Sequence, residues 1–562
     1  MFNKLLLSFR TAILGDGGDG VSFLWNFWWV KKSILELVQN PFYSDYMFYP
    51  NMMDLHLHTL ILGPALMVLP IQIFFGPVIS LNAYVLLSFI LSGVGAYMLI
   101  KLFVCQKYIA FFGGIVFSFN TYVISHAYGH FNLTTTWPIP FIMYFLEKLN
   151  NTKKTKYAMY SSILYIFLIY SDLQYAVFTF MLVIFWIAWK VANDIYHKKD
   201  CLLLVKPLVL FAALILVGSI PYLTTVKSGF EKNFSKPDQI AVEFYSPQNI
   251  LSYVIPPEGT VINQRIAKYN KELAKISTSS PEWATYLGIS IIILIPFIFF
   301  RLISKREDHY LFWICIFLLF FVLSLGPKIN ISQTLTIVSP LQSIYTLPII
   351  DMTRVPIRML IIAILAVSIL SSIVLSNIKN NKTKHVVVLI FSAIYCFEIF
   401  SLPVSIQKLE TPKAYPFLES QKDNKEDNQK DESIIEFPLF LTDRMDILGE
   451  KHNNILYYQT IHEYKMINGY LSYTSPGFLK KYIDISGMLF LIEPSGYKTP
   501  ENEDLDELKN YLFDKGQLKY AILHKKYLTE YDRNCLYSFI ENDLSGKIKY
   551  DDSEIVIYEV YK

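Results

Sequence analysis

Charged residues and cysteine are both scarce in this sequence of 562 residues. Only 17% of the residues are charged, and 50 basic and 47 acidic side chains leave a net charge of +3. So small a net charge, with no basic stripe along the chain, argues against a nucleic-acid partner. The five cysteines, at positions 105, 201, 315, 396 and 535, have no C-x-x-C spacing. They therefore predict neither a disulfide framework nor a zinc site.

Motifs typical of soluble enzymes are missing as well. No G-x-S-x-G, Walker loop, Rossmann glycine set or H-E-x-x-H stands in a suitable context. The N-terminal run "KLLLSFRTAILG" is too short to span a membrane, contains Arg10 and lacks an A-x-A-like cleavage site. We therefore expect no secretory signal peptide, and we interpret the run as the tail of a first helix whose beginning is absent from this sequence, either because the start is misassigned or because the first helix is lost.

Hydrophobic residues, in contrast, make up 53% of the chain and are grouped into long runs such as "ISIIILIPFIFF" and "MLIIAILAVSILSSIVL". About 20 apolar residues are enough for a helix to cross the bilayer core. The composition therefore predicts a mainly α, polytopic membrane protein with about 10–12 transmembrane helices. The candidate segments are residues 60–76, 81–100, 108–127, 135–147, 157–171, 173–190, 203–223, 284–301, 309–326, 357–377 and 385–402.

Basic residues between these segments predict which loops share a side of the membrane, because Lys and Arg mark the cytoplasmic side. The basic connections are 147–156, 190–200, 301–308 and 377–385. The regions expected on the other side are 14–59, 224–283, 327–356 and everything after 403. An odd number of crossings must then connect the first loop to Lys148, although four segments lie between. We expect the short, proline-containing segment 135–147 to be the half-length or re-entrant one.

The chain after residue 403 has a different character. The charged stretch "ESQKDNKEDNQKDES" has the composition of a disordered linker. It precedes strand-like runs, "SIIEFPLF", "KYAILH" and "EIVIYEVY", and a helical "EDLDELKNYLFDKG". We therefore predict a transmembrane domain over 1–404, a charged linker over 405–429 and a small extracytoplasmic α/β domain over 430–562.

The stretch "LGDGGDGVSFLWNFWWVKK", residues 14–32, is the most informative part of the sequence. Glycine permits backbone angles that other residues avoid, so this loop can bring Asp16 and Asp19 close to a ligand. The two carboxylates could share a divalent cation, Mg²⁺ or Mn²⁺, or one of them could act as a general base. The alternative is a solvated Gly/Asp turn that leads into an anchor helix.

Aromatic and basic residues follow this acidic loop directly. Trp25, Trp28 and Trp29 predict a segment at the membrane interface, because tryptophan prefers the level of the lipid headgroups. Lys31 and Lys32 would then face lipid phosphates.

Histidines occur in two further polar stretches. His56 and His58 form an H-x-H pair that could bind a metal ion, although ordinary loop histidines are the simpler interpretation. His126, His130 and Asn132 lie at the end of an apolar helix in "SFNTYVISHAYGHFN". Polar groups at membrane depth are costly and usually functional, so these three side chains are candidates for lining a site.

Two more stretches lie at predicted helix starts. Arg354 and Arg358 in "DMTRVPIRM" could bind a lipid phosphate or pyrophosphate in bidentate fashion, and interfacial snorkelling is the alternative. Glu282 in "STSSPEWATYLG" follows Pro281, where capping of the helix N-terminus is the preferred interpretation.

Several of these stretches together resemble a known family. The residues that carry the resemblance are "GDGGDGVSFLWNFWW", "NPFYSDYMFYP", "SHAYGHFN", "RVPIRM" and the C-terminal "YYQTIHEYKMINGYLSY". The chain resembles the GT-C superfamily of integral membrane glycosyltransferases and, more narrowly, bacterial membrane proteins of the YfhO type. The resemblance covers most of the chain.

This resemblance implies inverting transfer of a sugar from a polyprenyl-phosphate donor to a cell-envelope glycan, lipid or protein. The reaction would take place on the extracytoplasmic face of the bacterial inner membrane. A first-loop aspartate, Asp19 in preference to Asp16, would deprotonate the acceptor, with a divalent cation as a possible cofactor. Arg354 and Arg358 would hold the leaving phosphate. The substrate-binding candidates are completed by His58, His126, His130, Asn132 and Glu282.

Two other functions are compatible with the sequence. A protein of the same scaffold without enzymatic activity could bind a lipid-linked polymer and assist its assembly or export. A transporter is the least favoured alternative, because transporters generally contain internal repeats and charged residues within their membrane helices. Most charges here cluster in loops instead.

Overall fold

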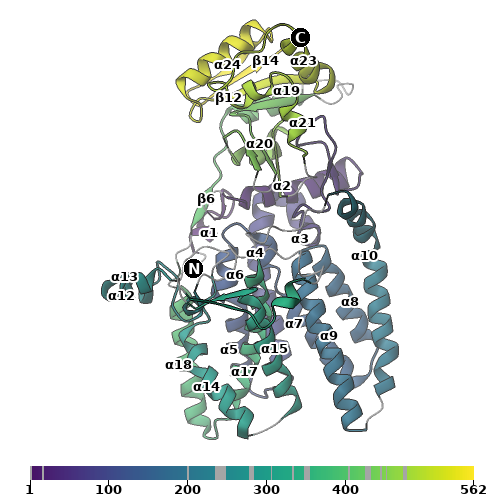
Figure 1. Cartoon of the computed structure of the whole chain (residues 1–562), viewed down its shortest axis with the longest axis vertical. Helices are drawn as coiled ribbons and strands as arrows, with labels where there is room; N and C mark the ends of the chain where they lie inside the picture. Colours follow the sequence, from purple (N-terminus) through teal and green to yellow (C-terminus); the bar gives the residue numbers. More distant parts are fainter. Residues whose placement is uncertain are drawn as a thin grey trace.

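The computed structural model describes the chain from residue 3 to 562 with a few gaps. The gaps are residues 16–17, 199–200, 234–248, 277–283, 305–306, 332–334, 347–354, 401, 403–404, 424–431, 444–445, 451 and 473–476. A helical bundle forms one end of the molecule, and a smaller domain with sheets lies at the other end (Figure 1). The first loop lies between the two (Figure 1).

Antiparallel apolar helices build the bundle. They are α4 (Leu69–Ile100), α5 (Lys107–Ser118), α7 (Pro138–Thr152), α8 (Lys156–Ile169), α9 (Leu173–Tyr196), α10 (Val205–Asn233), α14 (Ile289–Ser304), α15 (Asp308–Ser324), α17 (Leu360–Ser376) and α18 (Asn381–Phe400). The most apolar part of α17 is 89% buried, compared with 22% for α10 and 28% for α18. Helix α17 is therefore the core of the bundle, and the outer helices present apolar side chains to lipid.

Five helical spans in the described residues are long and apolar enough to cross a membrane. They are Leu69–Ile100, Leu173–Tyr196, Val205–Tyr222, Pro356–Ser376 and Asn381–Phe400. Several shorter apolar helices accompany them. The expectation of a mainly helical, polytopic membrane protein is thus confirmed.

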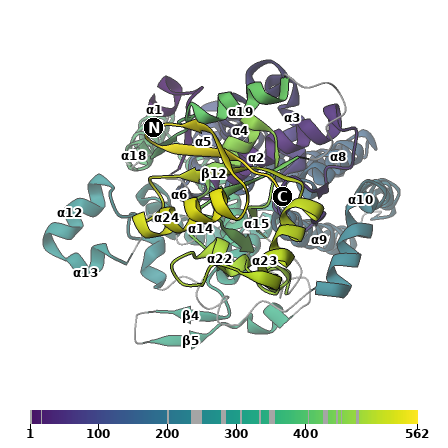
Figure 2. The same cartoon turned by 90° about the horizontal axis from the view of Figure 1, so that it is seen from above.

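Short elements connect the bundle helices. They are α6 (Thr121–His126), η2 (Phe131–Thr134), η3 (Cys201–Leu204), η4 (Ile250–Tyr253), α12 (Val261–Tyr269), α13 (Lys271–Ala274), β4 (Lys328–Asn330), β5 (Thr336–Val338), η6 (Gln342–Thr346) and η7 (Pro356–Met359). From above, α12, α13 and the β4–β5 hairpin lie at the rim, and the C-terminal domain covers the middle of the bundle (Figure 2).

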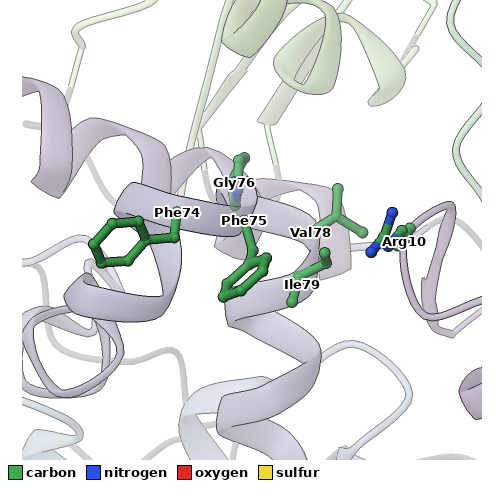
Figure 3. Close-up of a pocket in the computed structure, with 7 residues that line it drawn as sticks. Arg10, Phe74, Phe75, Gly76, Val78 and Ile79 are labelled. Carbon is green, nitrogen blue, oxygen red and sulfur yellow. The ribbon is translucent and has the colours of Figure 1, made fainter.

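The start of α4 corrects the predicted number of crossings. Gly76 adopts φ 79° and ψ 175°, which breaks the helix just before Pro77. The helix runs across the end of the bundle up to this turn and then turns to run along the bundle (Figure 3). Residues 60–76 are therefore not a separate crossing. Helix α7 has 15 residues, fewer than a full crossing of the bilayer core needs, so the expectation of a half-length or re-entrant segment at 135–147 stays a prediction.

The basic connections lie together, as expected. Because consecutive helices are antiparallel, the α7–α8, α9–α10, α14–α15 and α17–α18 connections share the end of the bundle opposite the C-terminal domain (Figure 1). Which side of the membrane this end faces stays a prediction from the positive-inside rule.

Helix α2 (Gly20–Lys31) lies across the bundle end, beneath the C-terminal domain (Figure 1). Residues 20–30 are all buried, because the helix is apolar all round rather than amphipathic. The Trp25 indole donates to Gln459 at 2.6 Å, and the ammonium of Lys32 lies 2.6 Å from a carboxylate oxygen of Glu463. Trp25, Trp28 and Lys32 therefore bind the C-terminal domain, whereas the Trp29 indole donates to the carbonyl of Pro41 in the first loop. All four side chains are buried in the protein, so the prediction that they face lipid is wrong.

The other N-terminal elements are short. They are α1 (Asn3–Leu7), β1 (Ala12–Leu14), η1 (Lys32–Glu36), β2 (Tyr43–Ser44), β3 (Met53–Asp54) and α3 (Leu62–Met67). Strand β1 pairs antiparallel with β6 (Ile406–Lys408), so the beginning of the C-terminal region is bound to the start of the first loop.

The C-terminal region is an α/β domain. Its five-stranded sheet has the order β10-β7-β12-β14-β13, and a three-stranded sheet has the order β11-β8-β9. The strands are β7 (Ser433–Phe437), β8 (Leu441–Asp443), β9 (Asp446–Leu448), β10 (Lys465–Met466), β11 (Gly469–Leu471), β12 (Leu518–His524), β13 (Lys547–Asp551) and β14 (Ile555–Glu559). The three strand-like sequence runs thus form β7, β12 and β14.

Helices surround these sheets. They are α19 (Ala414–Asp423), α20 (Asn454–His462), α21 (Lys480–Ile483), α22 (Met488–Ile492), α23 (Asn502–Lys509), η8 (Asn510–Lys515) and α24 (Glu530–Asn542). Strand β6 and helix α19 lie within the stretch 405–429 that the sequence predicted as a linker. The described part of that stretch is therefore ordered, because Ala414, Tyr415 and Leu418 bury apolar surface in the domain.

Candidate active site

Asp19 lies at the start of α2, where the first loop meets both the bundle and the C-terminal domain. Its Oδ1 accepts a hydrogen bond of 2.6 Å from the Tyr470 hydroxyl. Its Oδ2 lies 3.5 Å from Nε2 of His130. The side chains of Asp19 and His130 remain 38% and 26% exposed, so this pair is accessible.

Two glycines explain how Asp19 and His130 meet. Gly15 has φ +120°, and a Cβ there would lie 2.6 Å from the carbonyl oxygen of Tyr128. Gly129 has φ +153°, and a Cβ there would lie 3.9 Å from the backbone nitrogen of Asp19. The two turns therefore pack backbone against backbone, which a larger residue at position 15 would prevent.

The Asp19 carboxylate has a favourable position but does not cap the helix. It lies at the N-terminus of α2, where the helix dipole stabilises negative charge. Its side chain makes no capping hydrogen bond to α2, and the Ser22 hydroxyl donates instead to the Asp19 carbonyl at 2.6 Å. The carboxylate is thus oriented toward Tyr470 and His130.

His126 and His130 lie together although the helix does not continue between them. Helix α6 ends at His126, and the chain turns through Gly129. The two imidazole rings are 5.6 Å apart between centroids. Nδ1 of His126 donates to the carbonyl of Tyr122 at 2.8 Å, which fixes its tautomer. The predicted pair is therefore formed by a turn rather than by one helix face.

Tyr470 comes from β11 of the C-terminal domain. Burial raises the pKa of its phenol, and the nearby Asp19 charge raises it further. The hydroxyl therefore stays protonated and acts as the donor to Asp19. The C-terminal domain thus supplies one wall of the candidate site.

His58 lies close enough to Asp19 to feel its charge, but its hydrogen bonds go to Asn26 and Ser472. Its Nε2–H donates to Asn26 Oδ1 at 3.0 Å, and the Ser472 hydroxyl donates to Nδ1 at 2.9 Å. Burial lowers the pKa of His58 to about 4, although the charge of Asp19 opposes this shift. His58 is therefore a neutral imidazole near pH 7 that holds the first loop against the C-terminal domain.

The H-x-H pair does not converge on one site. Nδ1 of His56 lies 2.5 Å from Asp54, and its ring stacks on Phe42. His58 binds Asn26 and Ser472 instead. Separate partners of this kind agree with ordinary loop histidines.

A second polar group lies between η2, α9 and η7. The Asn132 amide donates to Asp172 Oδ2 at 2.7 Å, and Arg358 donates to Gln174 Oε1 at 2.8 Å. The Arg358 charge acts on Asp172, which caps α9 by accepting from the backbone of Tyr175 at 2.8 Å. Asn132 and Arg358, predicted from separate motifs, therefore belong to one network.

Tyrosines connect this network to the histidines. The Tyr175 hydroxyl lies 3.0 Å from that of Tyr122 and 2.9 Å from the carbonyl of Leu133. The Tyr122 ring lies 4.3 Å from that of His126. A continuous set of polar side chains thus leads from Asp19 to Arg358.

Three predicted site residues lie outside the described residues: Asp16, Glu282 and Arg354. Their expected roles stay predictions. Asp19 and Arg358, which share sequence motifs with Asp16 and Arg354, both take part in the candidate site.

The described residues around Asp19 are only part of the predicted metal site, because Asp16 lies outside them. Mg²⁺ and Mn²⁺ prefer several carboxylate or carbonyl oxygens, and the described side chains offer one carboxylate, a phenol and an imidazole. Across the described chain, no group of three or more His, Cys, Asp or Glu side chains could hold a metal ion.

Several residues of this site were not predicted from the sequence as binding groups. Tyr470 lies 451 positions from Asp19, and only its place in a motif of the GT-C resemblance pointed to it. Asp172 carried a usable signal, since an ionisable residue between two apolar segments is usually functional. Tyr122, Tyr175 and Gln174 carried none, because polar aromatic and amide side chains are common in such helices.

The fold agrees with a known class of membrane enzymes. It is similar to the cryo-EM structure of the arabinofuranosyltransferase AftD from Mycobacteria, with a TM-score of 0.59 and 10% sequence identity. The match covers 99% of this chain but only 41% of AftD, so the chain spans less than half the length of that protein. The chain is an integral membrane protein with the GT-C glycosyltransferase fold.

Sequence comparison places it in a family. A family model described as a domain of unknown function, DUF6311, matches residues 65–399, and the chain belongs to this family. No curated protein matches the sequence. The oligosaccharyltransferase AglB from Archaeoglobus fulgidus and a second structure of an oligosaccharyltransferase from that organism also match, with TM-scores of 0.43 and 0.45 and identities of 10% and 11%. These matches cover 98% of this chain and 71% and 70% of the archaeal chains. The likeness to the YfhO type stays a prediction.

Proposed function

We propose that this protein is a membrane glycosyltransferase that moves a sugar from a polyprenyl phosphate to an acceptor hydroxyl. The observation that carries the proposal is the accessible Asp19 carboxylate, held between His130 of the bundle and Tyr470 of the C-terminal domain. The GT-C fold and the position of Asp19 in the first loop support it.

Asp19 is proposed as the general base. Its carboxylate accepts the proton of the acceptor hydroxyl while the hydroxyl oxygen attacks the anomeric carbon of the donor. The bond from that carbon to the phosphate oxygen breaks, and the polyprenyl phosphate leaves with the bonding electrons. Attack from the face opposite the phosphate inverts the anomeric configuration. Tyr470 and His130 orient the carboxylate.

The network around Arg358 is proposed to hold the phosphate. A guanidinium matches the geometry of phosphate oxygens and neutralises the charge that develops as the donor bond breaks. Asp172 and Gln174 orient Arg358, and His126 and Asn132 line the path between the phosphate and Asp19. Arg354 and Glu282 would complete the donor side.

The cellular setting follows from the same proposal. The basic connections would be cytoplasmic, so Asp19 and the C-terminal domain would face the extracytoplasmic side of a bacterial inner membrane. The acceptor would then be a glycan, lipid or protein of the cell envelope. A divalent cation shared by Asp16 and Asp19 stays part of the proposal, and loss of transfer in EDTA with recovery in Mg²⁺ or Mn²⁺ would support it.

The test is a transfer assay with the purified full chain in detergent. Radiolabelled polyprenyl-phosphate sugars serve as donors, and a membrane extract serves as acceptor. Wild type is compared with Asp19→Asn and Asp16→Asn. The matched control is Asp54→Asn, which makes the same change in the same N-terminal region, at a carboxylate that binds His56.

Transfer by wild type and Asp54→Asn that is lost in Asp19→Asn would support the proposal. Loss in Asp16→Asn alone would move the base to the other aspartate. Equal transfer by all variants would refute the role of the loop. Binding of lipid-linked polymer without transfer from any donor would favour the non-enzymatic scaffold.

A further inference from the structure

An open cavity of about 340 Å³ lies beside the turn of α4 (Figure 3). Its lining consists of Arg10 and residues 74–79. The cavity therefore combines one cation with an apolar turn. None of these residues takes part in the hydrogen bonds around Asp19 or Arg358.

The turn exists because of glycine. Gly76 has a backbone conformation with φ 79° and ψ 175° that only glycine adopts readily. No atom lies within 4 Å of the position that a Cβ would occupy there. The absence of a side chain at Gly76 thus leaves the space next to this turn open.

Arg10 is held beside this space by its backbone. The buried amide of Asn82 on α4 donates to the carbonyl of Phe9 at 3.0 Å and to that of Ala12 at 2.7 Å. The guanidinium itself is exposed, and it has no ion-pair or hydrogen-bond partner among the described residues. A cation is therefore fixed at the rim of the cavity with its charge available to a ligand.

The residues before the turn are strongly apolar and exposed. Phe74, Phe75 and Ile73 are 79%, 59% and 49% exposed. They lie where α4 runs across the end of the bundle, a position typical of aromatic side chains at a membrane interface. Such large exposed groups next to a cation match a ligand with a phosphate and acyl chains.

We propose that this cavity binds an anionic phospholipid of the bilayer. Arg10 binds the headgroup phosphate, and Phe74, Phe75 and Ile79 contact the first methylenes of the acyl chains. The bound lipid also fixes the start of the first loop, since β1 follows Arg10 directly. The proposal is independent of the glycosyltransferase function, because it uses none of the residues assigned to the reaction.

The experiment is native mass spectrometry of the full chain in detergent, titrated with phosphatidylglycerol, with phosphatidylcholine of the same acyl chains and with undecaprenyl phosphate. Arg10→Gln is compared with Arg10→Lys and with Arg533→Gln. The last variant makes the same charge change on α24 of the C-terminal domain. Phe75→Ser tests the acyl contact with Arg10 in place.

Wild type is expected to prefer phosphatidylglycerol. Arg10→Gln should weaken that binding about fivefold and leave phosphatidylcholine unchanged, because one cation at the headgroup level contributes about this much. Arg10→Lys should keep most of the preference, and Phe75→Ser should weaken both phospholipids.

Several results would overturn the proposal. Arg10→Gln could bind phosphatidylglycerol like wild type, or Arg533→Gln could lose as much binding. A loss confined to undecaprenyl phosphate would assign the cavity to a polyprenyl lipid instead. Should Arg10→Gln fail to fold, unchanged phospholipid binding by Phe75→Ser would be sufficient to refute the site.

Discussion

The molecule contains two carboxylate–imidazole clusters that differ in accessibility. In the first, Asp19 and His130 meet between three parts of the chain, and both side chains remain partly exposed. In the second, Glu436 lies inside the C-terminal domain, 2.7 Å from His524 and 3.6 Å from His462. The Glu436 side chain is fully buried.

The buried cluster is built for stability. Burial alone would raise the pKa of Glu436, but the His462 and His524 imidazoles lower it to about 2. The Tyr415 hydroxyl donates to the same carboxylate at 2.7 Å. Because this carboxylate is fully buried, these partners offset the cost of burying its charge.

The contrast shows that residue types alone do not define a site. Both clusters pair one carboxylate with imidazole and phenol groups, and both have the chemistry of an acid–base centre. What separates them is the origin of their parts. The residues of the Asp19 cluster come from the first loop, the α6–α7 connection and β11, and they meet at a junction where a substrate can enter. The Glu436 cluster, in contrast, is enclosed by one domain.

The largest predicted effect is on transfer by Asp19→Asn. Loss of a general base typically slows a reaction about 10²- to 10⁴-fold, and the amide keeps the size of the side chain. The thermal midpoint of the protein should change little, because the side chain is partly exposed. Rates from the transfer assay and a melting curve of the same preparation test both parts. A slow variant that also melts early would indicate a structural role for Asp19.

Glu436→Gln should instead destabilise the C-terminal domain and leave transfer unchanged. Removing the charge from a buried, hydrogen-bonded pair costs about 3–5 kcal/mol, since the imidazoles lose their partner. Hydrogen exchange in the peptide that contains β12 should report this loss, while transfer per folded molecule stays at the wild-type level. Unchanged exchange would show that the cluster contributes little to the domain.

A smaller effect is expected on lowering the pH, through His452 beside the same cluster. Burial, with the nearby His524 charge, lowers the pKa of His452 from 6.5 to about 3. Below pH 6.5, His452 therefore binds a proton in the unfolded chain but not in the folded domain. The free energy of unfolding then falls as the pH decreases. Between pH 7 and 5 the loss is about 2 kcal/mol for this group.

The measurement is hydrogen exchange of the β12 peptide across that pH range, corrected for intrinsic rates. His452→Phe keeps the ring contact with Tyr527 and should flatten the dependence. The same slope in the variant would assign the acid sensitivity to other groups.

Local signals predicted part of the site. The glycines around Asp16 and Asp19 indicated a bent acidic loop, and the motif of His126 and His130 indicated a polar helix end. Both features are determined by a few neighbouring residues, so they can be predicted from the local sequence. The Gly-Pro pair at 76–77 also indicates a break, although the apolar run before it predicts a separate crossing.

Contacts between distant parts of the chain could not be predicted from such local patterns. An apolar, tryptophan-rich helix suits either a lipid interface or a protein interior, and only the C-terminal domain decides for α2. The partner of Asp19 on β11 lies 451 positions away. The periodicity and spacing of residues in a single sequence do not predict this contact, because it depends on how the C-terminal domain packs on the bundle.

The smallest predicted effect tests this contact between the domains. Tyr470→Phe removes the donor to Asp19 without changing the shape of the side chain, and transfer should fall about tenfold, as expected for one hydrogen bond to a charged group. Because that hydrogen bond stabilises the ionised carboxylate, the acid limb of the rate profile should move to higher pH. Tyr482→Phe is the matched control, since its buried hydroxyl donates to the carbonyl of Phe48 in the first loop and not to Asp19. If both variants lost the same activity, or if the acid limb stayed in place, Tyr470 would only hold the C-terminal domain on the bundle. The C-terminal domain would then have only a structural role at the Asp19 cluster, as it has at the Glu436 cluster. The two carboxylate clusters would differ in their exposure alone.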